Sequence, residues 1–141
     1  MKIKDLNWLE EIFNNLNLKH LPHGTIISGP EGLGKKILAK EIAIKLLLNK
    51  NSHKENIDLI EADNHPDLFL IDKEKILLHN ITFRKNKWDE DKGKRNVNDF
   101  LSITPSIAIN KVAIIFNAQT MNDESQNALL KSLEEPAPNT Y

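Results

Sequence analysis

The chain has 141 residues, of which 40% are hydrophobic and 28% are charged, a composition typical of a soluble globular domain. Its net charge of −1 excludes a global positive field that would attract nucleic acid, and the absence of cysteine excludes disulfides and thiolate metal sites. The charged, amphipathic N-terminal stretch is unlike a signal peptide, and no apolar run is long enough to span a membrane. These features predict a cytoplasmic protein with no membrane partner.

The first part of the chain predicts two helices and one strand around a glycine-rich turn. Apolar residues recur at helical spacing between residues 8 and 16, which indicates an opening helix. Residues 25–27 are β-prone and mostly apolar, so we expect a short buried strand at about residues 24–28. After the turn, a helix is expected at about residues 35–48. Its apolar face would consist of Leu38, Ala39, Ile42, Ala43, Leu46 and Leu47.

The second part of the chain continues the alternation of strands and helices. Residues 49–66 are polar and read as a loop, "DLFLID" predicts a buried strand, and residues 84–96 read as a charged loop. "VNDFLSI" predicts a short helix, and "KVAIIFNA" is the clearest strand in the chain. "NDESQNALLKSLEEP" predicts a helix capped by Asn122 or Asp123 and ended by Pro136. This order predicts a parallel α/β sheet. The core face of the last helix would consist of Ala128, Leu129, Leu130 and Leu133.

The turn "SGPEGLGKK" matches the phosphate-binding loop pattern G-x-x-x-x-G-K between a strand and a helix. Its glycines allow backbone N–H groups to approach a phosphate, and Lys35 stands where the phosphate-neutralising lysine belongs. The next position normally carries the hydroxyl that binds Mg²⁺, and here it is Lys36. The pattern therefore predicts a degenerate nucleotide site for ATP or ADP, and the alternative is a glycine-rich turn with no ligand. The site would consist of Gly29, Pro30, Gly32, Gly34, Lys35 and Lys36.

The acidic pair that completes an ATPase site is missing from the end of the strand at residues 111–118. There the apolar run ends in Phe116 and Asn117. A phenyl ring cannot support a metal ion, and a carboxamide cannot accept a proton as a general base. Because Lys36 is also unsuited to metal binding, we expect no hydrolysis, no catalytic residue and no bound metal.

The stretch "NALLKSLEEPAPNTY" closely resembles a signature of bacterial clamp-loader subunits, which are AAA+ proteins. The resemblance extends over "LPHGTIISGPEGLGKK", "NHPDLFLID" and the strand and helix from residue 111 onward. With its "GKK" loop and substituted acidic pair, the chain resembles the delta-prime branch of DNA polymerase III subunits. The signature residues are Asn127, Ala128, Leu129, Leu130, Lys131, Leu133, Glu134, Glu135 and Pro136.

The resemblance implies the fold and the domain organisation. The fold would be a three-layer P-loop NTPase (AAA+) parallel sheet with flanking helices, incomplete at the C-terminal end. Residues 1–141 would be the N-terminal part of a AAA+ ATPase-like domain, without the second AAA+ subdomain and the collar domain. In that family the strand after residue 141 lies between the first and third strands.

The resemblance also implies a function. The chain would belong to a non-hydrolysing subunit that helps load the sliding clamp onto primed DNA during DNA replication. Its partners would be gamma/tau-type and delta-type clamp-loader subunits, with the clamp and DNA engaged through the complex. Three alternatives stay open: an ATP-hydrolysing AAA+ motor subunit, a small-molecule P-loop kinase, and a nucleotide-binding module outside replication.

Several smaller features qualify this interpretation. Many relatives carry a four-cysteine zinc module before the "HPD" segment, but here His53 and His65 alone would make a poor site, so no zinc is expected. Asp67 follows a proline and reads as a turn residue rather than a catalytic acid.

The segment from Arg84 to Arg95 has basic residues around Trp88, a combination that can contact DNA. Because three acidic residues interrupt it, a solvated loop is favoured.

Overall fold

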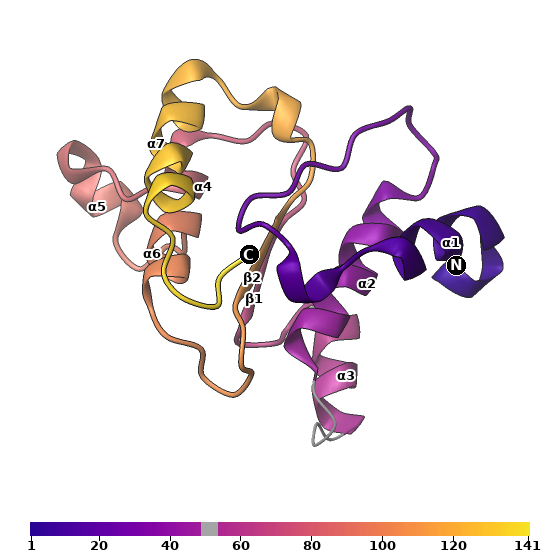
Figure 1. The fold of residues 1–141 in the computed structure, drawn as a ribbon. Coiled ribbons are helices and arrows are strands. Elements are labelled where there is room, and N and C mark those ends of the chain that lie inside the picture. The colour runs from indigo at the N-terminus through magenta and orange to yellow at the C-terminus, as the bar shows by residue number, and fades with distance from the viewer. Residues whose placement is uncertain (49–53) are drawn as a thin grey trace.

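A computed structural model describes residues 1–48 and 54–141, and Figure 1 shows two parallel strands between groups of helices. The strands are β1 (Leu68–Ile71) and β2 (Val112–Ile115). The helices are α1 (Asn7–Asn15), α2 (Lys35–Leu47), α3 (Lys54–Glu61), α4 (Leu78–Ile81), α5 (Trp88–Asp91), α6 (Val97–Ser102) and α7 (Asp123–Glu134). Short 3-10 helices lie at Ile3–Asp5, Leu18–His20, Lys85–Lys87 and Ala118–Thr120. None of the described helices has the length and apolarity that a bilayer crossing requires.

The two strands pair in parallel and send alternate side chains to opposite faces of the sheet. Leu68 pairs with Val112, and both join one apolar cluster with the helices at the N-terminal end of the chain. Their neighbours Phe69 and Ala113 pack against a second cluster on the other face. This alternation follows from the two-residue period of a strand and makes both faces of the sheet buried.

Helices cover the sheet on both sides (Figure 1). The first cluster contains Leu9 of α1, Ile42 of α2 and Ile60 of α3. The second contains Ile81 of α4 and Val97 of α6, with apolar residues of α7 packed against it. The predicted mixed α/β fold with a parallel sheet is therefore confirmed, as a small sheet of two strands.

The last residues of the chain lie along the outer edge of β2. The backbone N–H of Tyr141 donates to the oxygen of Lys111 at 2.9 Å, and the N–H of Ala113 donates to the oxygen of Tyr141 at 2.9 Å. Lys111 and Thr140 form an isolated parallel bridge. Because this pairing is parallel, residues 140 and 141 lie where a third parallel strand would add to the sheet beside β2.

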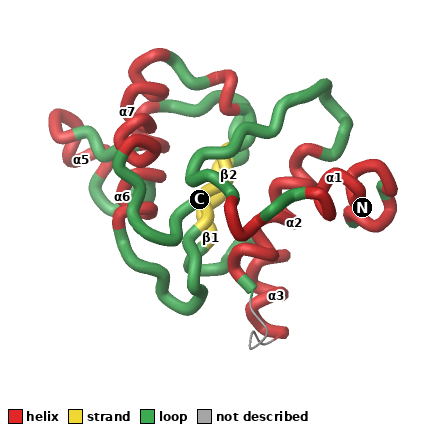
Figure 2. The backbone as a smooth tube through the Cα atoms, viewed as in Figure 1, coloured by secondary structure: helices red, strands yellow, loops and turns green. Residues whose placement is uncertain are grey.

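The strand predicted at residues 24–28 is wrong, because the segment between His20 and α2 is irregular (Figure 2). Ile26, expected to be buried, is 92% exposed. A strand is stable only where its backbone groups pair with a neighbour. The edge of β2 that faces this region is taken by Thr140 and Tyr141, so within residues 1–48 and 54–141 no strand lies beside residues 24–28.

The polar loop predicted at residues 49–66 is also partly wrong. Residues 49–53, which include His53, lie outside the described residues, but α3 follows them directly. Ile60 of α3 is 1% exposed and belongs to the first apolar cluster. Burial of this side chain outweighs the polar composition of the segment, since tertiary packing decides whether a weakly helical stretch folds.

Two further predictions need correction. The segment at residues 84–96 is not a featureless loop, because it contains a 3-10 helix and α5. On α7, Ala128 and Leu129 are half-buried as predicted, but Leu130 and Leu133 are each 43% exposed. The second cluster reaches only one side of α7, so the predicted apolar face is too wide.

Candidate functional site

The glycine-rich loop leads directly into α2, and two of its glycines have conformations that other residues rarely adopt. Gly32 and Gly34 have φ values of 78° and 80°, in the left-handed region. Gly34 is the N-cap of α2, and a Cβ added there would lie 3.0 Å from Cδ2 of Leu9 and 3.3 Å from Cδ1 of Leu6. Glycine at residue 34 is therefore required both by the turn and by the packing of the N-terminal residues against it.

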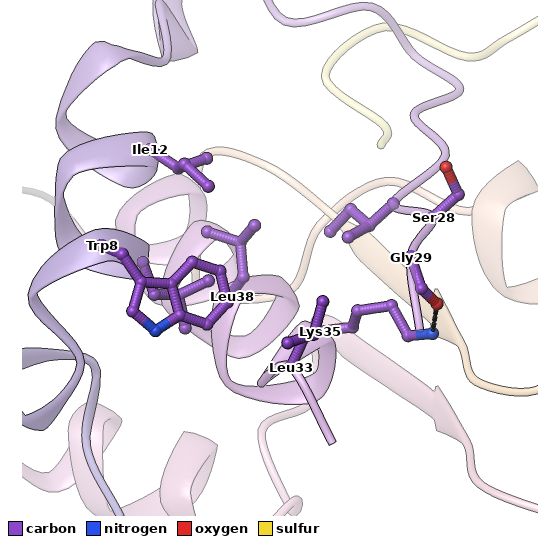
Figure 3. A pocket seen from close by; sticks show the side chains of 9 residues that line it. Trp8, Ile12, Ser28, Gly29, Leu33, Lys35 and Leu38 are labelled. Atoms are coloured by element: carbon purple, nitrogen blue, oxygen red, sulfur yellow. Dashed lines mark hydrogen bonds between the residues drawn. The ribbon is translucent and has the colours of Figure 1, made fainter. Parts of the chain in front are cut away.

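Lys35, the first residue of α2, closes the loop on itself. Its ammonium group donates a hydrogen bond to the carbonyl oxygen of Gly29, the first glycine of the motif (Figure 3). The structure thus brings the two ends of the predicted phosphate loop together. In this arrangement the ammonium group is hydrogen-bonded to a backbone carbonyl of the loop, so an incoming phosphate would have to compete with that carbonyl for it.

Lys36 connects α2 to the carboxyl ends of both strands. Its Nζ lies 2.8 Å and 3.0 Å from the two carboxylate oxygens of Asp72, the residue after β1. The same Nζ lies 4.8 Å from the ring centre of Phe116, the residue after β2, a cation–π distance. The position that carries the magnesium-binding hydroxyl in active loops is therefore occupied by a cation with its own protein partners.

Phe116 and Asn117 follow β2 as predicted, and both have structural contacts. Phe116 is 8% exposed and belongs to the first apolar cluster. Asn117 has a left-handed backbone, with φ of 56°, and its amide nitrogen donates to the oxygen of Lys73 at 2.9 Å. Among residues other than glycine, asparagine and aspartate adopt this left-handed conformation most readily. Asn117 therefore joins the segments that follow the two strands and supplies no carboxylate.

Asp72 is the site residue that the sequence analysis missed. It is the last residue of "DLFLID", so a signal was present: a carboxylate at the carboxyl end of a buried parallel strand, where ligand sites gather. What the sequence does not reveal is that the ion pair with Lys36 neutralises this carboxylate. The charge that could have attracted a metal is thereby balanced inside the chain.

A small apolar cavity of about 90 Å³ lies beside the loop. Figure 3 shows that residues of α1 and α2 wall it together with the loop. Its lining consists of Trp8, Leu9, Ile12, Ile27, Ser28, Gly29, Leu33, Lys35 and Leu38. The polar loop atoms of Ser28 and Gly29 lie at one side, so the cavity adjoins the candidate phosphate loop.

The signature helix is held to α6 but leaves most of its signature exposed. The amide nitrogen of Asn98 donates to the oxygen of Ala128 at 2.9 Å, and the hydroxyl of Ser132 donates to Oδ1 of Asn98 at 2.6 Å. Ala128, Leu129 and Pro136 are half-buried. The exposed signature residues are Asn127, Leu130, Lys131, Leu133, Glu134 and Glu135.

Asp67 is a buried structural anion. It is fully buried, and its carboxylate accepts hydrogen bonds from the backbone N–H groups of Ser106, Ile107 and Ala108 at 2.6–2.9 Å. Burial by itself raises the pKa of Asp67, but the three N–H donors and the charge of His65 together outweigh burial and hold the pKa below its ordinary value. Asp67 therefore orders the loop before β2, and it lies in a turn, as predicted.

Among the described residues, His65 and the Asp and Glu side chains do not form a metal centre. Burial lowers the pKa of His65, against the opposing charge of Asp67, and its Nδ1 accepts a hydrogen bond from the N–H of Asp67 at 3.1 Å. Within residues 1–48 and 54–141, no group of three or more His, Asp or Glu side chains could hold a metal ion. Because His53 lies outside that part, the expected lack of zinc stays a prediction.

Taken together, fold and site define an α/β protein with a parallel sheet and a degenerate phosphate-loop motif. The family model described as "DNA polymerase III, delta subunit" matches residues 5–141. The chain therefore belongs to this family, which confirms the family predicted from the signature at residues 127–136.

The curated relatives are delta-prime subunits. The DNA polymerase III subunit delta' of Pseudomonas aeruginosa is 31% identical over 84% of this chain, and that of Haemophilus influenzae is 28% identical over 95%. The Bacillus subtilis subunit delta' is 25% identical over 97%. The chain spans 35% to 41% of the length of these three proteins. No solved structure gave a significant match.

Proposed function

We propose that this chain is the N-terminal part of a clamp-loader subunit that supports its neighbours without hydrolysing ATP. The whole protein would assemble with gamma/tau-type and delta-type subunits and help load the sliding clamp onto primed DNA. Membership of the DNA polymerase III delta subunit family and the similarity to subunits named delta' support this assignment. The role of the chain itself is architectural.

The observation that carries the non-hydrolysing role is the contact of Lys36 with both strand ends. Lys36 pairs with Asp72 at 2.8 Å and lies over the ring of Phe116. An ATPase needs at this place a hydroxyl and a carboxylate around Mg²⁺, with a base for the attacking water. Here an ammonium group, an apolar ring and the amide of Asn117 stand instead. An ATP-hydrolysing motor subunit and a small-molecule kinase both require the missing groups.

We infer that the loop at Gly29, Pro30, Gly32, Gly34, Lys35 and Lys36 is a nucleotide site reduced to its framework. The turn keeps its left-handed glycines, and no side chain of the described residues caps the start of the helix behind it. Because both lysines have partners within the chain, ATP or ADP would have to displace them. Such a loop is suited to stiffening the junction of α2 with the sheet.

The proposed complete fold is a AAA+ parallel sheet, of which β1 and β2 are two strands. Its support is the parallel bridge between Lys111 and Thr140, which runs in the direction of a further strand. The side chain of His23 reaches toward the same place, since its Nδ1 lies 2.6 Å from the oxygen of Thr140. A strand continuing from Tyr141 would then lie between β2 and residues 24–28 and give that segment a partner.

The assembly claim is tested by co-purifying the full-length parent protein with gamma/tau-type and delta-type subunits. We expect a stable complex. Leu130→Asp should weaken it, because this signature leucine is 43% exposed and belongs to neither apolar cluster of the described residues. Leu77→Asp is the matched control, since Leu77 is 46% exposed on α4's N-cap, outside the signature. A folded parent that binds neither type of subunit would contradict the proposal.

A further inference from the structure

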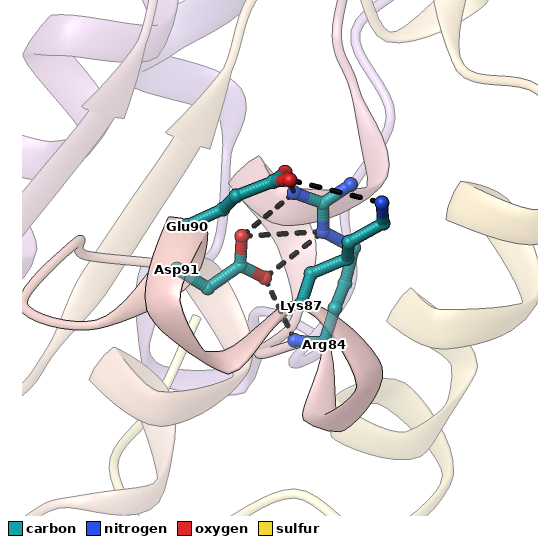
Figure 4. Close-up of polar contacts among 4 residues, drawn as sticks. All are labelled: Arg84, Lys87, Glu90 and Asp91. Atoms are coloured by element: carbon teal, nitrogen blue, oxygen red, sulfur yellow. Dashed lines mark hydrogen bonds and ion pairs between the residues drawn. The ribbon is translucent and has the colours of Figure 1, made fainter.

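The segment from Arg84 to Arg95, here called the Trp88 knob, projects from the body of the molecule. Figure 1 shows its helix α5 at the outer edge of the molecule, beyond α4 and α6. Contacts between Arg84 and Asp91 tie the start of the knob to α5 (Figure 4). The guanidinium of Arg84 donates to the Asp91 carboxylate at 2.7–3.2 Å, and the backbone N–H of Arg84 donates to it at 2.8 Å. The Asp91 side chain is only 3% exposed, so this ion pair holds the knob together from its buried side.

The knob presents an aromatic ring in a positively charged setting. Trp88 is 52% exposed, and the ammonium of Lys92 lies 4.8 Å from its ring centre. The knob holds six basic and three acidic side chains, an excess of three positive charges. Since the whole chain has net charge −1, the remaining residues carry an excess of four negative charges. The positive charge is thus concentrated on this projection.

The acidic residues of the knob are largely neutralised from within. The hydrogen bond from Arg84 is the main reason that the pKa of Asp91 is lowered to about 2, so Asp91 stays ionised and bound to Arg84. One carboxylate oxygen of Glu90 lies 3.3 Å from a guanidinium nitrogen of Arg84, and the other lies 3.7 Å from Nζ of Lys87. Asp89 forms no ion pair within residues 1–48 and 54–141. These pairs also neutralise Arg84 and Lys87 in part, so the acidic residues leave the knob a net excess of three positive charges, with Lys85, Lys92 and Lys94 outside the ion pairs of the described residues.

We propose that the Trp88 knob binds single-stranded nucleic acid. An exposed indole offers a stacking surface for an unpaired base, and the surrounding ammonium groups attract the phosphodiester backbone. An open hollow of about 330 Å³ beside the ring is lined by residues 85–90, including Lys85 and Lys87. A duplex fits this surface less well, because its bases are already stacked on one another. The inference does not depend on the proposed role in clamp loading.

The proposal is tested with the whole 141-residue chain and a labelled oligothymidylate at low salt. Fluorescence anisotropy should show saturable binding whose affinity falls as salt increases, with a slope in log–log form of about −0.7 for each phosphate contact. Trp88→Ala should weaken binding about tenfold, and Trp88→Phe should restore most of it, because stacking needs an aromatic ring. Circular dichroism of each variant checks that the fold is unchanged.

Charge is tested with two matched double variants. Lys92→Glu with Lys94→Glu should weaken binding by more than tenfold. Lys4→Glu with Lys19→Glu makes the same change in net charge at exposed positions outside the knob and should have a much smaller effect. Three results would overturn the proposal: no saturable binding, binding that Trp88→Ala leaves unchanged, or equal binding of heparin or of duplex DNA.

Discussion

Lys36 and Asp72 form an ion pair of 2.8 Å that joins the start of α2 to the end of β1. Both side chains are about half exposed, so the pair contributes on the order of 1 kcal/mol or less to stability. Its importance lies in its position. It places a positive charge and its counter-ion where an active phosphate loop holds Mg²⁺, so a metal ion would have to displace Lys36 before it could bind Asp72.

This arrangement predicts that magnesium has no effect on nucleotide binding. Calorimetric titration of the chain with ATP should give the same result in Mg²⁺ and in EDTA, whether or not binding is detectable. Lys36→Thr is the informative variant, because it removes the cation, adds a hydroxyl and frees Asp72. Any response to Mg²⁺ should appear in that variant. A tenfold strengthening by Mg²⁺ in the unaltered chain would show that the site still holds the metal.

Asp67 predicts a large and pH-dependent loss of stability. Asp67→Ala leaves three backbone N–H groups without their acceptor and should lower the free energy of unfolding by about 3 kcal/mol or more. Asp67→Asn keeps one acceptor oxygen and should cost less. Denaturant titrations at several pH values measure both effects.

The sign of the pH dependence follows from the lowered pKa of Asp67. The carboxylate stabilises the fold fully above its unfolded-state pKa of about 3.8 and loses this effect as pH falls through the lower folded-state pKa. The difference in stability between the unaltered chain and Asp67→Asn should therefore be constant near neutral pH and shrink below about pH 4. A difference that grows on acidification would contradict the assigned hydrogen bonds.

The irregular segment at residues 24–28 predicts a weakly cooperative fold for residues 1–141 alone. Two strands make a marginal sheet, and we expect a broad thermal transition. Ile26→Lys should change stability by less than about 0.5 kcal/mol here, because Ile26 is 92% exposed. If a further strand follows Tyr141, as proposed, the transition should sharpen in a chain that includes this strand, and the same substitution should become destabilising there.

Two observations would count against this view of the sheet. A sharp thermal melt of residues 1–141 with well-dispersed amide signals would show that the two-strand sheet suffices. An Ile26→Lys variant that is equally harmless in the longer chain would show that residues 24–28 never form a buried strand.

The sequence correctly predicted those helices and strands whose local apolar pattern matches the side chains that they bury in the fold. β1, β2, α2 and α6 lie where apolar runs or helical periodicity placed them, and Asn122 caps α7 as expected. The strand at residues 24–28 failed because a strand depends on a neighbour that local pattern does not specify. Helix α3 was missed because one buried side chain, Ile60, decides its packing.

The candidate site was predicted from its motif, and its contacts were not. The pattern identified Lys36, Phe116 and Asn117 as departures from an active site, and Lys35 as the retained lysine of the phosphate loop. It did not identify Asp72 as the partner of Lys36, because the two lie 36 residues apart and meet only in the folded chain. The ion pair between Arg84 and Asp91 also cannot be predicted from a run of mixed charges, although it shows that the segment is folded around a buried carboxylate.

The central claim is that this chain does not hydrolyse ATP, and steady-state phosphate release tests it most directly. The assay should be run on the chain and on the longer protein proposed to contain it, with and without primed DNA. We expect no release above background, and none in Lys36→Thr, because Phe116 and Asn117 still provide no carboxylate. Phosphate release that Lys35→Ala abolishes would contradict the claim.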